Sequence, residues 1–362
     1  MTNDLTFSDF TVQLRGFISR AARDDHAFNA LALALFELQF QHNAAYQTLC
    51  HARKVTPTDV WHWTEIHAVP TSAFKEMEMT SLPESQRTTV FHSSGTTEQR
   101  RSRHFHDAES LAIYQASLLP WFRAHLLPRS EKPTLLCLTP PPAQAPHSSL
   151  AFMFATAQRE CGATNSCFSG GVDSSGAWTL DFSATLAVLQ NSLSGKNPLV
   201  VLGTAFSFVH LLDELAARGI SFALPVGSRV LETGGYKGRS RVLPKSELHA
   251  LITQRLGVLA SHIVCEFGMS EMSSQAYDRM AGDNFQPAFH FPPWARARVV
   301  SPETGREVAE GETGLLQVFD LANVRSVLAV QTEDLAARRG DGFELLGRAA
   351  QAESRGCSLM TL

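Results

Sequence analysis

The chain has 362 residues, a length that favours two domains or one large core with subdomains. Hydrophobic residues make up 44% and charged residues 18%, so the chain can bury a sizeable core and is not disordered as a whole. Its formal net charge is −4, which gives no general electrostatic case for binding nucleic acid or an anionic membrane.

Cysteine spacing and the first residues indicate the compartment. The six cysteines include no Cys-x-x-Cys pair and lie too far apart for a dense disulfide framework, which favours the reducing cytoplasm. Residues 1–10 have neither a basic segment nor an apolar run, so no signal peptide is expected. The most apolar stretch, residues 198–212, is too short and too polar for a membrane span. The histidine and cysteine spacing predicts no zinc cluster.

A helical N-terminal segment is predicted to be followed by alternating strands and helices. Residues 1–85 are expected to be mainly helical, because residues 28–38 form a nearly continuous apolar face. Beyond them we expect strands at 89–91, 134–138, 199–202, 222–224, 229–231 and 263–267, and helices at 111–127, 206–217 and 244–256. This alternation predicts an α/β layered core with a largely parallel sheet.

A β-rich pattern follows residue 287. Short strands are expected at 296–300, 314–319, 326–331 and 343–346, separated by glycine-containing turns. The predicted organisation is therefore a mainly helical segment (1–85), a core (86–347) whose β-rich subdomain covers about 288–347, and a short tail (348–362).

A loop rich in hydroxyl groups follows the strand predicted at 89–91. Its residues are Ser93, Ser94, Gly95, Thr96 and Thr97. Such a loop can turn N–H groups and hydroxyls toward one anion, and glycine allows the backbone a close approach to phosphate. The Walker pattern is absent, and by itself the segment is more simply a polar surface loop.

Four other segments follow predicted strands and carry residues that can bind parts of a nucleotide or a metal ion. They are Glu232-Thr233-Gly234-Gly235, Phe267-Gly268-Met269-Ser270-Glu271, Thr332-Glu333-Asp334 and Gly347-Arg348. An aromatic ring can stack on a base, and a carboxylate can hold Mg²⁺ beside phosphates. The Thr332 segment is expected to be an acidic loop, suited to accept hydrogen bonds from ribose hydroxyls.

The order SSGTT, TGG, FGMSE, TED and GR resembles the motif order of the adenylate-forming superfamily, which includes acyl-CoA synthetases, peptide-synthetase adenylation domains and firefly luciferase. The similarity runs from about Thr88 to the C-terminus. One branch resembles the chain more specifically: the acyl-protein synthetases of bacterial bioluminescence, the LuxE family. The segments that carry this resemblance are FHSSGTT, HSSL, LPVGSRVLETGGYKGR, EFGMSE and ESRGCSL. The implied fold is the N-terminal core of an adenylate-forming enzyme without the full mobile C-terminal domain.

The resemblance also implies roles for single residues. Ser93, Ser94, Gly95, Thr96 and Thr97 would hold the β- and γ-phosphates of ATP; Gly234, Gly235, Phe267 and Gly268 would surround adenine; Asp334 and Arg348 would contact ribose; Ser270 would lie near the α-phosphate; and Glu271 would hold Mg²⁺. His147 and Ser148 fall where the family places acyl-pocket residues, although capping a helix explains them equally well. Which of Arg100, Arg101 and Arg103 replaces the usual basic residue of the phosphate loop stays open.

A cysteine near the C-terminus completes the implied chemistry. Cys357 lies in Arg355-Gly356-Cys357-Ser358, where the arginine would favour the thiolate. The family activates a fatty acid as an acyl-adenylate, moves the acyl group to a cysteine of the enzyme and passes it to a reductase partner. For this chain the resemblance implies that the acceptor is a reductase or a carrier protein. Two alternatives are a ligase that uses coenzyme A or a carrier-protein thiol, and a nucleotide-binding module that has lost catalysis.

Overall fold

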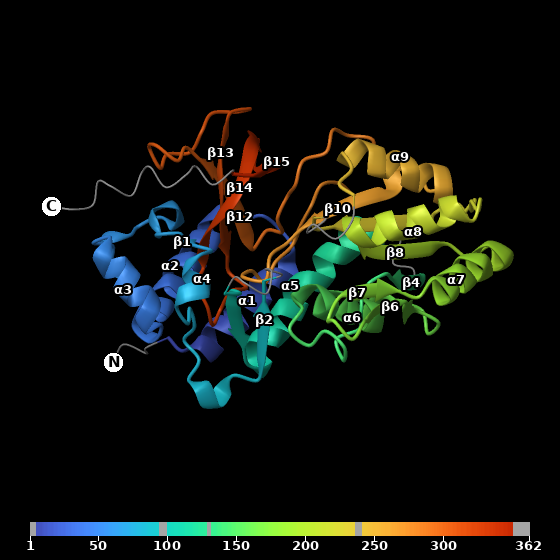
Figure 1. Cartoon of the computed structure of the whole chain (residues 1–362). Helices are drawn as coiled ribbons and strands as arrows, with labels where there is room; N and C mark the ends of the chain where they lie inside the picture. The colour runs from blue at the N-terminus through green and yellow to red at the C-terminus, as the bar shows by residue number, and fades with distance from the viewer. Residues whose placement is uncertain (1–4, 94–99, 129–131, 236–240, 350–362) are drawn as a thin grey trace.

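The computed structural model describes residues 5–93, 100–128, 132–235 and 241–349 (Figure 1). Its helical N-terminal part, in blue, lies beside the β-rich part, and the α/β part extends to the other side. Among these described residues, no helix is long and apolar enough to cross a membrane.

The N-terminal segment is helical, as predicted. Its elements are α1 (Phe7–Arg20), α2 (Asp25–His42), α3 (Ala44–Ala52), η1 (Pro57–Asp59), η2 (Trp63–Glu65), β1 (Val69–Pro70), α4 (Ala73–Glu76) and η3 (Glu84–Gln86). Polar side chains fix where these helices begin, because each satisfies a free N–H group of the first turn. Thr6 and Asp9 form a capping box at α1, Asp24 caps α2, and Asn43 caps α3.

A six-stranded sheet with the order β11-β10-β9-β8-β4-β5 forms the α/β part. Its strands are β4 (Thr134–Cys137), β5 (Cys167–Phe168), β8 (Leu199–Thr204), β9 (Arg229–Thr233), β10 (Ile263–Phe267) and β11 (Ala276–Tyr277). Only the edge pair β10–β11 is antiparallel in this sheet, so the predicted largely parallel sheet is confirmed.

Helices cover both faces of this sheet, since successive side chains of a strand point to opposite faces. Val200 and Leu202 contribute to the core beneath α5 (Ala108–Leu126) and α6 (Ser149–Cys161). Val201 belongs to the opposite core, under α7 (Phe182–Gly195), α8 (Ala205–Ala217) and α9 (Lys245–Leu256). This burial on both faces explains the continuous apolar runs of the strands.

The predicted β-rich region is a five-stranded sheet with the order β1-β14-β13-β12, and β15 pairs with β14. Its long strands are β12 (Ala295–Val300), β13 (Thr313–Asp320), β14 (Ala329–Arg339) and β15 (Gly342–Arg348). Two small hairpins complete the described strands: β2 (Thr89–His92) with β3 (Arg103–His106), and β6 (Gly170–Val172) with β7 (Trp178–Leu180).

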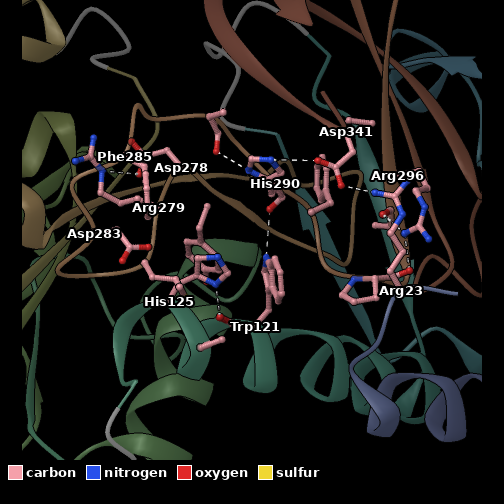
Figure 2. A pocket seen from close by; sticks show the side chains of 18 of the residues that line it. Arg23, Trp121, His125, Asp278, Arg279, Asp283, Phe285, His290, Arg296 and Asp341 are labelled. Atoms are coloured by element: carbon pink, nitrogen blue, oxygen red, sulfur yellow. Dashed lines mark hydrogen bonds and ion pairs between the residues drawn. The ribbon is translucent and has the colours of Figure 1, made fainter. Parts of the chain in front are cut away.

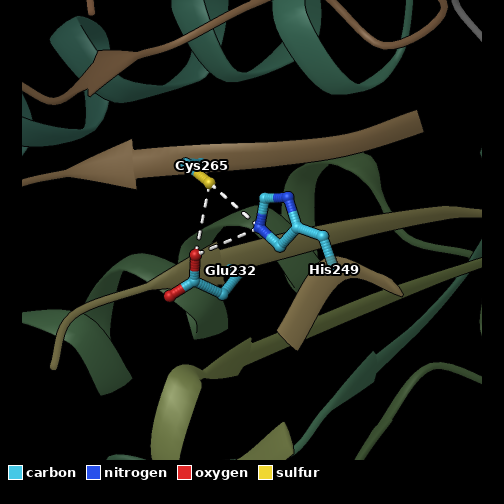
Figure 3. Close-up of side chains that lie close together, drawn as sticks. All are labelled: Glu232, His249 and Cys265. Atoms are coloured by element: carbon cyan, nitrogen blue, oxygen red, sulfur yellow. Dashed lines mark hydrogen bonds and ion pairs between the residues drawn. The ribbon is translucent and has the colours of Figure 1, made fainter. Parts of the chain in front are cut away.

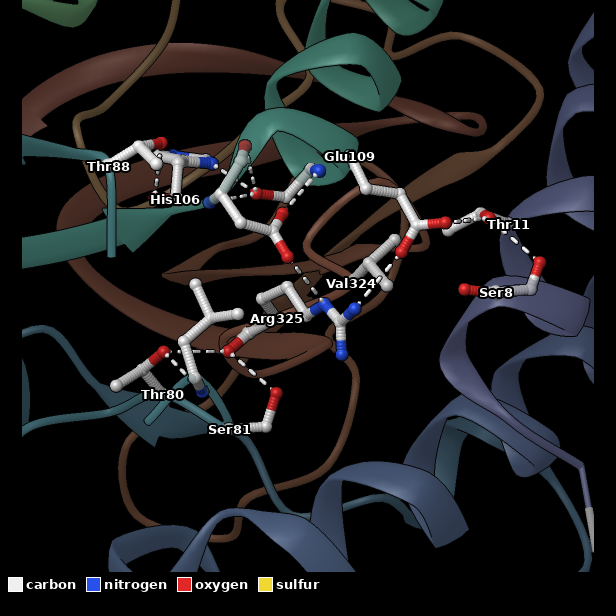
Figure 4. Close-up of polar contacts among 12 residues, drawn as sticks. Ser8, Thr11, Thr80, Ser81, Thr88, His106, Glu109, Val324 and Arg325 are labelled. Carbon is white, nitrogen blue, oxygen red and sulfur yellow. Dashed lines mark hydrogen bonds and ion pairs between the residues drawn. The ribbon is translucent and has the colours of Figure 1, made fainter. Parts of the chain in front are cut away.

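The N-terminal helices share a core cluster with this β-rich sheet, and Arg325 forms a polar link between the two (Figure 4). Its guanidinium contacts Asp107 at 3.3 Å and Glu109 at 3.0 Å, both at the start of α5. Thr11 of α1 donates to Glu109 at 3.0 Å. Because Arg325 is mostly buried, this network joins α1, α5 and the β13–β14 connection more firmly than exposed pairs would.

Several predicted elements are wrong. Residues 222–224 form no strand; Phe222 and Leu224 instead donate backbone hydrogen bonds to the last residues of α9. Residues 326–328 belong to the β13–β14 connection. Thr332–Asp334 is not a loop but lies within β14. Helices α6 and α7 were not predicted.

Candidate functional site

The predicted nucleotide motifs meet where two neighbouring parallel strands end. Thr233 is the last residue of β9 and Phe267 the last of β10, and the two strands pair in register. Carboxyl ends of parallel strands are the usual binding edge of an open α/β sheet. Gly234 follows Thr233 with φ +68°, a conformation that favours glycine, and both Gly234 and Gly235 are exposed.

A path of hydroxyl groups joins the first motif to the third. The Ser102 N–H donates to Ser93 Oγ at 3.0 Å, and Ser102 Oγ lies 3.4 Å from Ser270 Oγ. Ser270 in turn donates to Glu271 Oε2 at 3.0 Å. The β2–β3 hairpin therefore brings the beginning of the SSGTT loop to the buried Ser270 and Glu271.

His104 holds the backbone of Ser270 from the other side. Its Nδ1 lies 2.8 Å from the Ser270 carbonyl oxygen, so the neutral ring must donate from this nitrogen. Burial lowers the pKa of His104 to about 4, and the hydrogen bond to Ser270 only partly opposes this effect. His104 and His106 are both almost fully buried on strand β3.

Buried side chains of the β13–β14 region fix the segment after Glu271. Asp320 accepts hydrogen bonds from the Ser273 and Ser274 backbone N–H groups at 3.0 and 2.8 Å, and from Ser274 Oγ at 2.7 Å. Asn323 donates to the Glu271 carbonyl at 3.0 Å. Asp320 and Asn323 were missed in the sequence because neither lies in a recognisable motif.

The fourth and fifth predicted motifs pair across two strands. Asp334 on β14 and Arg348 on β15 are register partners, and their charged groups lie 3.9 Å apart. Burial raises the pKa of Asp334; Arg348 opposes that shift, whereas Glu333 and Glu271 add to it. The Arg348 side chain is 76% exposed and is free to meet a ligand.

Phe267 and its neighbour Glu266 have contrasting surroundings. The Phe267 ring is 7% exposed and packs edge-on against Phe289 and Phe343. Glu266 accepts a very short hydrogen bond from Thr233, which ties the ends of β9 and β10 together. Burial raises the pKa of Glu266 to about 7 despite that bond, and the nearby Glu232 adds to the shift.

The two predicted substrate residues have structural contacts. Ser148 caps α6 by accepting from the Ala151 N–H at 3.1 Å. His147 is exposed, and its Nδ1 lies 3.0 Å from the Val90 carbonyl oxygen. Its ring packs against His92, the residue before Ser93, so His147 does lie beside the beginning of the phosphate-loop motif.

Part of the predicted site lies outside the described residues: Ser94, Gly95, Thr96, Thr97 and Cys357. Of the three candidate arginines downstream of the loop, Arg100 pairs with Glu76 at 3.4 Å and Arg103 with Glu78 at 3.0 Å. Those two guanidinium groups therefore already have acidic partners. Gly268, within the described residues, directly follows β10 beside Glu266.

A separate cavity of about 440 Å³ opens beside α5 and the β14–β15 turn (Figure 2). Trp121 donates to the His290 carbonyl at 3.2 Å, and His290 Nε2 lies 3.4 Å from Asp341. Arg23 and Arg296 line the same cavity. None of the predicted nucleotide-binding residues that the structure describes lines it, so this cavity is distinct from the described part of the motif cluster.

Comparison with known proteins identifies the family. The sequence model of the family described as "Acyl-protein synthetase, LuxE" matches residues 3–361. The chain belongs to this family. A long-chain-fatty-acid–luciferin-component ligase of Aliivibrio fischeri is 26% identical to this LuxE-family chain over 192 residues, which are 50% of this chain and 49% of the relative. The chain thus spans about half the length of the curated relatives it matches.

Solved structures show that this LuxE-family chain has the fold of the adenylate-forming enzyme core. A 2-hydroxyisobutyryl-CoA ligase in complex with 2-HIB-AMP superimposes with a TM-score of 0.66 at 13% identity, covering 91% of this chain and 70% of the ligase. ATP-bound MatB from Rhodopseudomonas palustris has a TM-score of 0.52 at 16% identity, covering 74% of this chain and 49% of MatB. The predicted fold class is confirmed.

Proposed function

We propose that this protein is an ATP-dependent acyl-protein synthetase, which activates a fatty acid as acyl-AMP and transfers the acyl group to its own Cys357. One observation carries the proposal. In a LuxE-family chain with this fold, Ser270 and Glu271 directly follow β10 at the carboxyl edge of the α/β sheet, and Ser102 links them to Ser93 at the beginning of the SSGTT loop.

In the first step, a carboxylate oxygen of the fatty acid attacks the α-phosphorus of ATP and pyrophosphate leaves. Ser93, Ser94, Gly95, Thr96 and Thr97 hold the β- and γ-phosphates through N–H and hydroxyl groups in this proposal. Positioning and electrostatic stabilisation supply most of the rate enhancement in such displacements. The buried, hydrogen-bonded Ser270 suits this purpose because its hydroxyl is already oriented by Glu271.

In this proposal the adenine of ATP is assigned to the ends of β9 and β10, and the ribose to the β14–β15 pair. Gly234 and Gly235, exposed and without side chains, leave room for adenine after β9, and Phe267 and Gly268 lie at the end of the neighbouring strand β10. Asp334 accepts from the ribose hydroxyls, and the exposed Arg348 contacts the ribose from the neighbouring strand.

The acid substrate is assigned to a different segment. His147, beside His92, is assigned to the entry of the carboxylate, whereas Ser148 acts through the cap of α6.

A magnesium ion fits the donor set of this region. Glu271 offers a carboxylate, and the neighbouring Ser270 adds a hydroxyl oxygen; oxygen atoms are the ligands Mg²⁺ prefers. Glu271 is the protein ligand in this proposal. When bound, the ion supplies positive charge that balances the charge on the phosphates. Asn323 fixes the Glu271 backbone, and this contact limits movement of the carboxylate.

In the second step the Cys357 thiolate attacks the acyl carbon of acyl-AMP, a thioester forms and AMP leaves. Arg355 favours the thiolate through its positive charge. The thioester keeps the acyl group activated for transfer to a protein partner, a reductase or a carrier. The A. fischeri relative is named a long-chain-fatty-acid–luciferin-component ligase. That name supports a carboxylic acid substrate in this proposal.

Intact-protein mass spectrometry tests the proposal. The protein is incubated with Mg²⁺-ATP and single fatty acids of eight to eighteen carbons. We expect a mass gain of one acyl group that neutral hydroxylamine removes and that Cys357→Ala abolishes. Cys167→Ala is the matched control, because Cys167 is the most exposed of the described cysteines, and it should acylate normally. Release of AMP without acylation of any cysteine would instead indicate an external thiol such as coenzyme A.

A further inference from the structure

Three potential metal ligands lie together under helix α9, away from the groups assigned to the reaction (Figure 3). Glu232 is on β9 and Cys265 on β10, and the two are register partners in the parallel pair. Their side chains therefore point to the same face of the sheet. His249, on α9, reaches toward them from the helix that covers this face.

The distances among the three ligand atoms fit one tetrahedral ion. Cys265 Sγ lies 3.2 Å from Glu232 Oε2 and 3.5 Å from His249 Nε2, and the nitrogen lies 3.6 Å from the same carboxylate oxygen. Ligands of tetrahedral zinc, at bond lengths of about 2.0–2.3 Å, are separated from one another by about 3.4–3.6 Å. An ion fits among these atoms with shifts of a few tenths of an ångström.

The position of this cluster is unusual for a layer between a helix and a sheet. The residues two positions earlier on the same strands, Val230 and Ile263, pack in an apolar core with Leu248 and Ile252 of α9. Glu232 is 8% exposed and Cys265 is 2% exposed, so the cluster is nearly as buried as this core. Burying a carboxylate here is costly unless it is paired or binds a metal.

The local charges also favour a divalent cation. Metal binding converts the cysteine to a thiolate, which together with the Glu232 carboxylate supplies two negative charges. Two charged side chains near the cluster, Lys245 and Asp278, neutralise each other, because Lys245 Nζ lies 3.2 Å from Asp278 Oδ2. Asp278 itself is occupied by the Cys265 backbone N–H at 2.8 Å.

We propose that Glu232, His249 and Cys265 form a binding site for a divalent transition metal of the zinc class, with water as the fourth ligand. Sulfur and imidazole select zinc-like ions over Mg²⁺, so this site is chemically separate from the one proposed at Glu271. A metal here joins β9, β10 and α9 directly behind Gly234 and Phe267. It stabilises the two strand ends on which the adenine pocket is proposed.

Metal analysis of tag-free protein tests this site. The protein is supplied with zinc, passed through a desalting column and analysed by elemental mass spectrometry. We expect about one zinc per chain and a higher melting temperature than for the chelator-treated protein, because a ligand of the native state stabilises it. Replacement of zinc by Co²⁺ should give a thiolate-to-cobalt charge-transfer band in the near ultraviolet. These readouts do not depend on ligase activity.

Two variants and a control assign the ligands. Cys265→Ser and His249→Gln should each lower retained zinc at least tenfold and remove the melting-temperature increase, and Cys265→Ser should also remove the charge-transfer band. Cys161→Ser, another buried cysteine on the opposite side of the sheet, should keep the metal. If Cys265→Ser fails to fold, the cobalt band of the wild type and the zinc retained by His249→Gln still test the site. Wild-type protein that retains no zinc, or cobalt protein without the thiolate band, overturns the site and leaves a hydrogen-bonded cluster.

Discussion

Ser102 Oγ lies 3.4 Å from Ser270 Oγ, although the two residues are 168 positions apart in the sequence. This contact connects the β2–β3 hairpin, which carries the SSGTT loop, to the segment that follows β10. It is fully buried and is supported on one side by Ser93 and on the other by Glu271. Ser93, the first residue of the loop motif, is therefore linked through Ser102 and Ser270 to Glu271, the residue proposed for magnesium.

Replacing Ser102 by alanine tests this relation. Ser102→Ala removes the hydroxyl link while leaving the backbone bond to Ser93, so we expect a stability loss of about 1 kcal/mol. Acid-dependent ATP–pyrophosphate exchange should fall about five- to tenfold, because positioning of Ser270 is lost. Ser192→Ala is the matched control: it removes a buried hydroxyl that donates to Asn197 and should lower stability alone. Equal exchange in the two variants would contradict a positioning role for Ser102.

Arg348→Ala separates ligand contact from stability. The Arg348 guanidinium is 76% exposed and lies 3.9 Å from Asp334, so this ion pair contributes little to folding and the free energy of unfolding should change by less than about 0.5 kcal/mol. The KM for ATP should rise about tenfold if the guanidinium contacts the ribose. Arg159→Ala is the control. It removes an exposed arginine on α6 and should change neither the free energy of unfolding nor the KM for ATP. An unchanged KM for ATP in Arg348→Ala would remove this residue from the proposed site.

Glu266 predicts a particular dependence of stability on pH. Its pKa of about 7 in the folded protein exceeds the ordinary value of 4.5, because burial disfavours the carboxylate. Between these pH values the unfolded chain releases a proton that the folded chain keeps, so this residue destabilises the fold increasingly as pH rises from 4.5 to 7. Glu266→Gln does not titrate. Its stability relative to wild type should therefore improve by about 2 kcal/mol between pH 5 and pH 8, as measured by urea unfolding. A difference independent of pH would contradict the raised pKa.

Two glycines that end helices allow a matched test of crowding. Gly257 has φ +70°, and an added Cβ would lie 2.9 Å from the Ala223 backbone. Gly219 has a similar φ of +65° with open space around it. Gly219→Ala should cost about 1 kcal/mol from backbone strain, whereas Gly257→Ala should cost about 3 kcal/mol because it adds a clash. Similar losses in denaturant unfolding would show that the contact between Gly257 and residues 222–224 yields easily.

The strand ends were predictable, and the residues that connect them were not. Thr233, Phe267 and the glycines after them lie at the ends of apolar strands, where periodicity and motif agree. Ser102, His104 and Asp320 act through contacts with residues far away in the sequence, and no local pattern marks such partners.

Tertiary pairing also explains the misplaced elements. The Thr332–Asp334 segment is polar and was expected to be a loop, but it continues β14 between β13 and β15, where Asp334 pairs with Arg348. Residues 222–224 have a strand-like composition but hydrogen-bond to the end of α9 instead of to a strand. The Glu232, His249 and Cys265 cluster escaped the spacing analysis because its members come from three different elements.

Acid-dependent exchange of labelled pyrophosphate into ATP is the measurement that tests the central claim most directly. It reports acyl-AMP formation alone and does not depend on Cys357 or a partner. We expect exchange with at least one fatty acid of eight to eighteen carbons, and a decrease of at least a hundredfold in Glu271→Gln. Pure, folded protein that binds ATP but shows no acid-dependent exchange with any of these acids would contradict the proposed activation step.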